Sequence, residues 1–179
     1  MIKKEIVKIA KDYIGEKEIS NNQGFLNKKF EEEMKSVGFE KGHSWCSYFA
    51  ELVWTKAYRK FDKLELVSII RNAFSANAVK TSSHFIAKGF LFDKNAEIGS
   101  LAIWMKYKDG KPVELSPGWY AGHIGIVSEV SFTGFKTIEG NTDAKGGREG
   151  IEVAEKARQF SWGSNSGLRL TGFVHPKEV

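Results

Sequence analysis

The stretch 122–141 reads GHIGIVSEVSFTGFKTIEGN and decides the fold, because it predicts a β-hairpin. Two runs with strand character, 122–130 and 135–141, flank a short turn that contains Gly134. Successive side chains of a strand point to opposite faces of the sheet. The hairpin is therefore expected to have one polar face and one aliphatic face, the polar face made of His123, Gly125, Val127, Glu139 and Asn141.

The register of this hairpin determines whether its polar side chains meet. A loop over Phe132–Gly134, with its glycine in the left-handed conformation, places Val127 opposite Glu139. A slip of one residue would send Glu139 to the face opposite His123. We therefore expect a loop with an odd number of residues.

Helical patterns come before the hairpin. Apolar residues recur at helical spacing over 2–14, over 25–37 and from Cys46 onward, and the second of these helices is expected to be surface-exposed. The stretch 64–88 is compatible with helical or irregular structure. Its predicted core residues are Phe74, Ala78 and Phe85.

Strand patterns dominate the second half of the chain. Besides the hairpin, the runs 100–104 and 172–174 read as short strands separated by glycine-rich turns. Helices followed by strands are typical of an α+β fold. We expect one domain over residues 1–179, with N-terminal helices packed on a C-terminal antiparallel β-sheet.

The only cysteine, Cys46, lies at the start of the third predicted helix, with Ser44 as the expected N-cap. A helix N-terminus carries partial positive charge and unpaired amide groups, which favour a thiolate and supply donors for an oxyanion. Cys46 is therefore a candidate nucleophile. The alternative is a small buried apolar residue without a chemical role.

A thiol hydrolase also needs a base and a group that orients this base. His123 can serve as the base, and Glu139 or Asn141 as the orienting group, because the hairpin places them on one face. The other histidines have no such partner in the sequence; they are His43, His84 and His175.

Charge and composition exclude several functions. The net charge of +5 is spread along the chain, so nucleic-acid binding is not expected. The first residues alternate charged and apolar side chains, unlike a signal peptide, and no segment is apolar enough to insert into a membrane. We expect a monomer made in the cytoplasm that acts on the cell wall or in the periplasm after release or export.

Three blocks of the sequence resemble the signatures of CHAP domains, the cysteine, histidine-dependent amidohydrolases and peptidases. They are GHSWC at 42–46, GHIGIV at 122–127 and TIEGNT at 137–142. Weaker similarity covers most of the chain, including 15–24, 147–151 and 172–176, and single-domain phage endolysins are the most similar members. The chain departs from the family pattern at Ser100, where the family often has aspartate, and in a long charged insertion at 106–118.

The resemblance implies a papain-like fold and cleavage of an amide bond in bacterial peptidoglycan. It assigns Cys46 as nucleophile, His123 as base and Glu139 as orienting group, with Asn141 nearby. The substitution Glu139→Gln is then expected to leave folding intact and to lower the rate only in part. Two alternatives stay open beside an endolysin: a cell-wall amidase effector or toxin with the same chemistry, and a non-catalytic cell-wall-binding module. A thiol peptidase that acts inside the cell is a third.

Further site residues are expected around this set. Asn22 and Gln23 are candidates for the second oxyanion donor, and Arg148 for contact with a carboxylate of the stem peptide or for a solvated loop position. Trp119 either lines the groove or, as we favour, belongs to the core. No metal and no cofactor are expected, because 16–22 lacks the alternating Asp/Asn ligands of a calcium loop and the cysteine and histidines lack zinc spacing.

Overall fold

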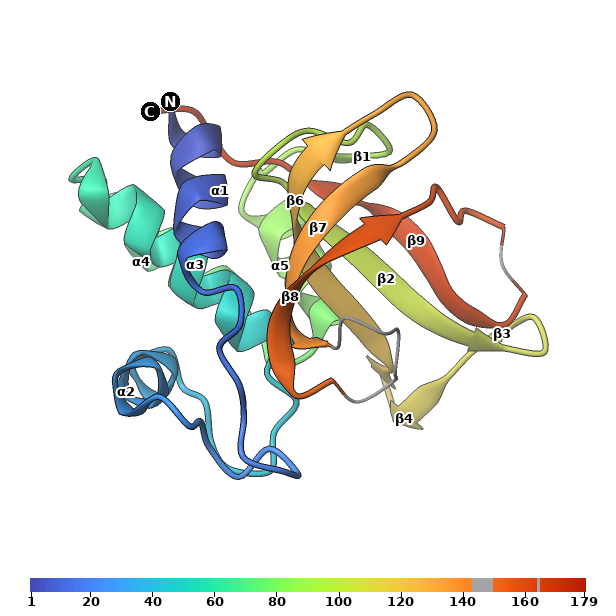
Figure 1. Ribbon diagram of the computed structural model, residues 1–179. Helices are drawn as coiled ribbons and strands as arrows, with labels where there is room; N and C mark the ends of the chain where they lie inside the picture. The colour runs from blue at the N-terminus through green and yellow to red at the C-terminus, as the bar shows by residue number, and fades with distance from the viewer. Residues whose placement is uncertain (143–149, 164) are drawn as a thin grey trace.

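The computed structural model describes residues 1–142, 150–163 and 165–179 and has an α+β fold. Helices occupy one side of the molecule and an antiparallel sheet the other, as Figure 1 shows. The predicted order, helices first and strands afterwards, is confirmed. The two ends of the chain lie beside each other, with the amino group of Met1 3.1 Å from the Glu178 carboxylate (Figure 1).

The α-helices of the described residues are α1 (Ile2–Asp12), α2 (Lys28–Ser36), α3 (Cys46–Lys60), α4 (Leu64–Ala73) and α5 (Ala78–Ala87). The helix α2 begins at Lys28 rather than at Phe25, because the side chain of Asn27 accepts hydrogen bonds from the next backbone amides as an N-cap. It also buries Phe30 and Met34, so only part of its surface is exposed.

The stretch 64–88 holds α4 and α5. Its three predicted core residues, Phe74, Ala78 and Phe85, are buried, so that prediction is confirmed. Asn77 caps α5 by accepting a hydrogen bond from the amide of Lys80.

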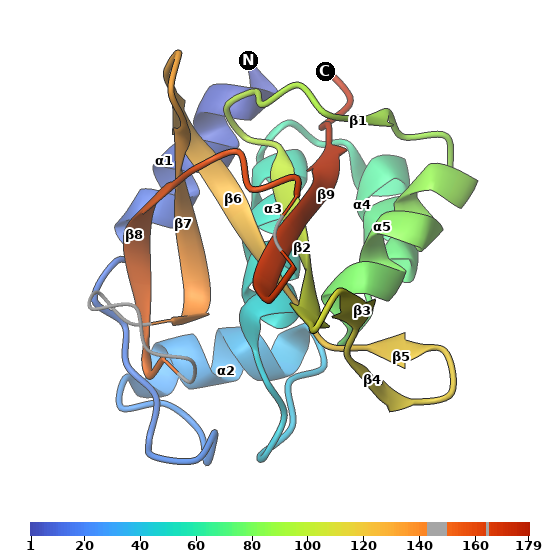
Figure 2. The same ribbon diagram turned by 90° about the vertical axis from the view of Figure 1, so that its right-hand side faces the viewer.

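The main sheet has the order β1-β9-β2-β6-β7-β8, with every neighbouring pair antiparallel and with β3 added to the end of β2. The strands β4 and β5 form a separate ribbon, which projects at the lower right of Figure 2. The strand β8 was not predicted. The bounds are β1 (Phe92–Asp93), β2 (Leu101–Lys108), β3 (Lys111–Pro112), β4 (Glu114–Ser116), β5 (Trp119–Tyr120), β6 (Gly122–Val130), β7 (Phe135–Thr142), β8 (Glu152–Arg158) and β9 (Gly167–Val174).

The strands β6 and β7 form the predicted hairpin in a different register. Val127 pairs with Thr137 rather than with Glu139. The loop spans 131–134, and its glycine has no positive φ, so the predicted turn is wrong. A β-bulge just after Val127 takes up one more residue. Because these two one-residue changes add to two, His123 and Glu139 still lie on the same face.

The sheet carries a hydrophobic core on each face. The larger core lies against the helices and includes the fully buried Trp45, Trp54 and Tyr58. The smaller core contains Trp104 and Phe135 and is covered by side chains of the segment after β8. The hairpin of β6 and β7 is therefore packed from both sides, which fixes the positions of its polar side chains.

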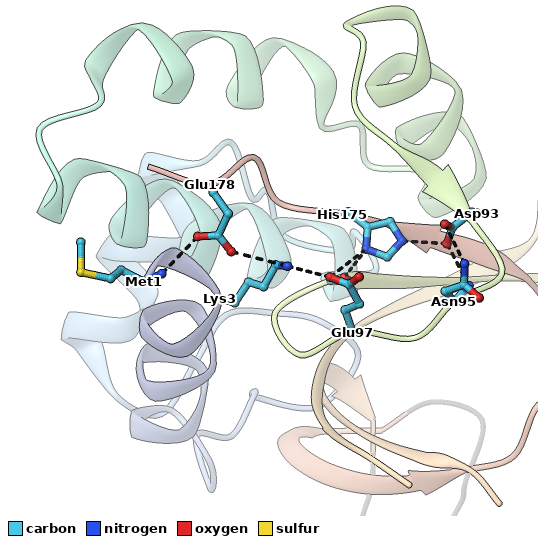
Figure 3. Close-up of polar contacts among 8 residues, drawn as sticks. Met1, Lys3, Asp93, Asn95, Glu97, His175 and Glu178 are labelled. Carbon is cyan, nitrogen blue, oxygen red and sulfur yellow. Dashed lines mark hydrogen bonds and ion pairs between the residues drawn. The ribbon is translucent and has the colours of Figure 1, made fainter. Parts of the chain in front are cut away.

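A series of polar contacts ties the ends of the chain to the edge of the sheet (Figure 3). Lys3 donates to Glu97 at 2.7 Å and lies 3.5 Å from Glu178. The buried His175 contacts Asp93 through Nε2 at 2.8 Å. These contacts hold α1 and the C-terminal segment against β1, which is a structural role.

Candidate active site

Cys46 is the first residue of α3, as predicted. Trp45 holds the N-cap position, and no side chain caps the helix. The prediction of Ser44 as N-cap is wrong, because the helix starts one residue later than that cap requires and Ser44 is exposed. The amide groups of the first turn therefore remain available to a ligand.

Glu18 anchors the loop that leads into α3. Its buried carboxylate accepts a hydrogen bond from the indole of Trp45 and another, at 3.2 Å, from the backbone amide of Asn22. The carbonyl of Asn22 accepts a hydrogen bond from the amide of Gly42 at 2.8 Å. The loop after α1 thus fixes the loop that ends in Cys46, a function of Glu18 that the sequence analysis missed.

Two glycines allow the strands to approach the nucleophile. A Cβ at Gly140 would lie 2.6 Å from the ring of Trp45 and 2.7 Å from the Cβ of Phe49, at the start of α3. A Cβ at Gly125 would lie 2.7 Å from the Cγ of Glu139. Side chains at these positions would push α3, β6 and β7 apart. Gly125 therefore makes room for the side chain of Glu139.

His123 on β6 connects the thiol to a carboxylate. Its Nε2 lies 2.8 Å from Oε2 of Glu139, and Cys46 is close enough to contribute to the raised pKa of His123. Because Nε2 faces Glu139, Nδ1 is the nitrogen left for Cys46. Burial alone lowers the pKa of His123, but the charge of Glu139 and the hydrogen bonds with Cys46 and Glu139 outweigh burial and raise it. The structure thus brings together three of the predicted site residues.

Glu139 is completely buried and is held by three side chains. Besides His123, Arg158 donates through Nε to Oε1 at 2.7 Å and through Nη2 to Oε2, and the hydroxyl of Thr137 donates to Oε1. Burial raises the pKa of Glu139, but His123 and Arg158 outweigh it and lower the pKa. Glu139 therefore stays ionised and can orient the imidazole.

Arg158, at the end of β8, was not predicted as a site residue. Its guanidinium also lies over the ring of Trp104, 5.0 Å from the ring centroid, and Trp104 in turn lies 6.0 Å from the ring of His123. The presence of Glu139 on the predicted hairpin could have pointed to a partner such as Arg158, because a buried carboxylate needs a cation or several hydrogen-bond donors. Its strand was missed because β8 is an edge strand rich in charged residues.

Asn141 lies where β7 becomes irregular. Its φ is +53°, the pairing of β7 with β8 shifts between Glu139 and Thr142, and the Asn141 side chain is half-buried. Among the described residues it makes no hydrogen bond with Cys46 or His123. Of the two predicted orienting groups, Glu139 is hydrogen-bonded to His123. Asn141 lies two residues further along β7 and makes no such contact among the described residues.

The two candidate oxyanion donors differ in their surroundings. The side-chain Oδ1 of Asn22 is buried and has no hydrogen-bond partner among the described residues. Asn22 lies in the loop held by Glu18. Its backbone carbonyl accepts the hydrogen bond from Gly42, so Asn22 is next to the loop that precedes Cys46. Gln23 is exposed and donates to the carbonyl of Asn21 at 3.2 Å. The structure thus favours Asn22 over Gln23 for contact with a ligand.

Trp119 lies in the ribbon of β4 and β5 and is half-buried, with the ammonium of Lys80 4.4 Å from its ring centroid. The favoured assignment to the core is wrong, because this ribbon stands apart from the main sheet. Arg148 lies outside the residues that the structure describes.

The other histidines lie elsewhere. His43 is exposed and contacts the hydroxyl of Tyr48 at 3.2 Å, and His84 is exposed on α5. His175 does have a carboxylate partner, Asp93, which the sequence did not reveal, and its Nδ1 lies 3.1 Å from the hydroxyl of Ser100. This set belongs to the structural contacts of Figure 3 and not to the surroundings of Cys46.

Over the described parts of the chain, no three or more His, Cys, Asp or Glu side chains are grouped so that they could hold a metal ion. None of the helices in these parts has the length and apolar character needed to cross a membrane.

Comparison of the chain with protein-family models, with curated proteins and with solved structures finds no match.

Proposed function

We propose that this protein is a cysteine amidohydrolase or peptidase with a papain-like arrangement of helix and sheet. One observation carries the proposal: His123 is hydrogen-bonded to the buried Glu139, and Cys46, at the N-terminus of α3, lies close enough to His123 to contribute to its raised pKa. A nucleophile, a base and an orienting group in this order form the unit that thiol hydrolases use.

The reaction follows from these positions. His123 takes the proton of the Cys46 thiol, and the sulfur attacks the carbonyl carbon of the substrate amide. The carbonyl oxygen becomes an oxyanion beside the free amides of the first turn of α3. His123 gives its proton to the departing amine as the carbon–nitrogen bond breaks, which leaves a thioester on Cys46. His123 then takes a proton from water, the hydroxide attacks the thioester, and the thiol is released with its proton.

The proposed substrate is bacterial peptidoglycan, because the three sequence blocks that supply Cys46, His123 and Glu139 resemble those of CHAP domains. Either the N-acetylmuramoyl-L-alanine bond or a peptide bond of the stem or cross-bridge is cleaved. The protein then acts as an endolysin of a phage, as a monomer without cofactor, after release or export to the cell wall.

A toxin or effector that cleaves peptidoglycan would use the same site. A non-catalytic wall-binding module is disfavoured, because binding alone does not require a thiol beside a histidine that is hydrogen-bonded to a buried carboxylate.

The test is mass spectrometry of the fragments released from purified peptidoglycans of several wall types, with the unmodified protein and with Cys46→Ala. Fragments released only by the unmodified protein would support the proposal, and their masses would identify the bond. If a folded protein releases no fragments from any wall type, peptidoglycan hydrolysis is refuted.

A further inference from the structure

A polar cavity of about 530 Å³ lies beside α3, apart from the candidate catalytic residues. Its size is typical of ligand-binding cavities. The lining is rich in hydrogen-bonding groups from α3, from α4 and from the segment that joins α4 to α5. The polar lining residues are Tyr48, Glu51, Ser68, Arg71, Asn72 and Ser75.

Glu51 is the residue that points to a ligand. Its side chain is buried, with the residue only 8% exposed, yet no described residue donates a hydrogen bond to its carboxylate. The nearest cation is Arg71, whose Nε lies 3.7 Å from Oε1, beyond hydrogen-bonding distance. Burial raises the pKa of Glu51 to about 7 even though the charge of Arg71 opposes this. The carboxylate therefore has no protein donor among the described residues and is open to the cavity that Glu51 lines.

Arg71 presents the opposite charge in the same cavity. Its Nη2 donates to the carbonyl of Ser36 at 2.9 Å, which fixes the guanidinium beside the cavity. A fixed guanidinium is well suited to bind a carboxylate. A carboxylate and a guanidinium side by side match a ligand that carries an ammonium and a carboxylate on one carbon atom.

Two elements of the fold connect the cavity with the elements that carry the reacting side chains. Glu51 follows Cys46 on α3 by about 7.5 Å of helix axis, at 1.5 Å per residue. On the other side, the segment that lines the cavity continues into Asn77, whose side-chain amide donates to the carbonyl of Tyr120 at 2.8 Å, shortly before His123. The cavity is thus connected to Cys46 through α3 and to the strand of His123 through Asn77.

We propose that this cavity binds a zwitterionic amino-acid group of the substrate peptide, with its ammonium on Glu51 and its carboxylate on Arg71. The identity of the peptide rests on the proposed function. In peptidoglycan, meso-diaminopimelate carries such a group at the end of its side chain, whereas lysine at the same position carries only an ammonium. The cavity therefore selects stem peptides that contain diaminopimelate.

The test measures binding without hydrolysis, with the full chain carrying Cys46→Ala. Isothermal titration calorimetry compares two N-acetylated tripeptides, L-Ala-γ-D-Glu-meso-diaminopimelate and L-Ala-γ-D-Glu-L-Lys. We expect the first to bind at least tenfold more tightly. Adding Glu51→Gln or Arg71→Gln should each weaken its binding at least tenfold, while the matched controls Glu65→Gln and Arg59→Gln, outside the cavity lining, should not.

The proposal is overturned if the two peptides bind equally, if neither binds, or if the cavity variants bind like the controls while their thermal melting shows that they are folded. Because the protein used cannot form a thioester, these results are separate from the test of hydrolysis. A hydrolase that cleaves both wall types equally would refute the cavity assignment and leave the proposed reaction intact.

Discussion

Replacing Arg158 with methionine should weaken both the fold and the reaction. Arg158 supplies two of the hydrogen bonds that hold the buried carboxylate of Glu139. Removing one partner of a buried ion pair costs about 3–5 kcal/mol. Because the Arg158 side chain is 23% exposed and His123 remains as a partner, we expect the lower end, about 3 kcal/mol. At about 2–4 °C per kcal/mol for a chain of this size, the melting temperature should fall by about 6–12 °C.

The same substitution should slow hydrolysis, because Glu139 would no longer be fixed behind His123. A displacement of about 1 Å at a catalytic group costs about 10²-fold in rate, so we expect kcat to fall by about that factor. Arg158→Lys keeps the charge but loses the two-pronged contact, and it should recover stability more than rate. Arg59→Gln, exposed near the end of α3, is the matched control and should change neither.

The pH dependence gives a readout that a merely structural arginine would not change. The pKa of Glu139 is lowered in the folded protein, so its ionised form adds stability above its unfolded pKa of about 4.3, and this is lost as the pH falls through the folded value. Without Arg158 that pKa rises, and the acidic limb of the kcat profile should move to higher pH. Unchanged melting temperature, kcat and acidic limb in Arg158→Met would refute this account of the site.

Two further predictions concern the supports of the site, and a third concerns the contacts near the ends of the chain. Gly140→Ala should reduce activity about 10²-fold and stability by about 1–3 kcal/mol, measured by fragment release and urea unfolding, because its Cβ collides with Trp45; a fully active variant would contradict this. Glu139→Gln should lower the melting temperature by several degrees, contrary to the expectation from sequence, because it leaves the neighbouring guanidinium without its charged partner. Asp93→Asn should lower stability by about 1 kcal/mol at pH 7 and leave hydrolysis unchanged, because its contact with His175 is distant from the reaction; the pKa of Asp93 is lowered, so this loss should shrink as the pH falls below about 3.9.

The sequence predicted the parts of the site that lie within local patterns. Cys46 was found because helical spacing begins at that residue, and His123 and Glu139 because strand alternation places them on one face. The predicted loop was wrong, yet the face was right, because a β-bulge offset the longer loop. The face on which a residue lies depends only on whether the register shift is odd or even. The two shifts together were even, so the prediction of the face was right although the register was wrong.

The missed residues act through contacts between segments that are distant in sequence. Glu18 reaches Trp45 across 27 positions, and Arg158 reaches Glu139 across 19. Neither lies in a pattern that marks it, since charged residues on a loop or an edge strand are normally solvated. The cavity around Glu51 was equally hidden, because this residue reads as the polar position of an amphipathic helix.

The most direct measurement of the central claim is the rate at which iodoacetamide alkylates Cys46, followed by intact mass. The chain has one cysteine, so every adduct reports on this thiol. We predict that at pH 7 the folded protein reacts at least tenfold faster than folded His123→Ala, because His123 serves as the base for the thiol. Equal rates in the two proteins would contradict the account, since Cys46 would then be a buried thiol without a base.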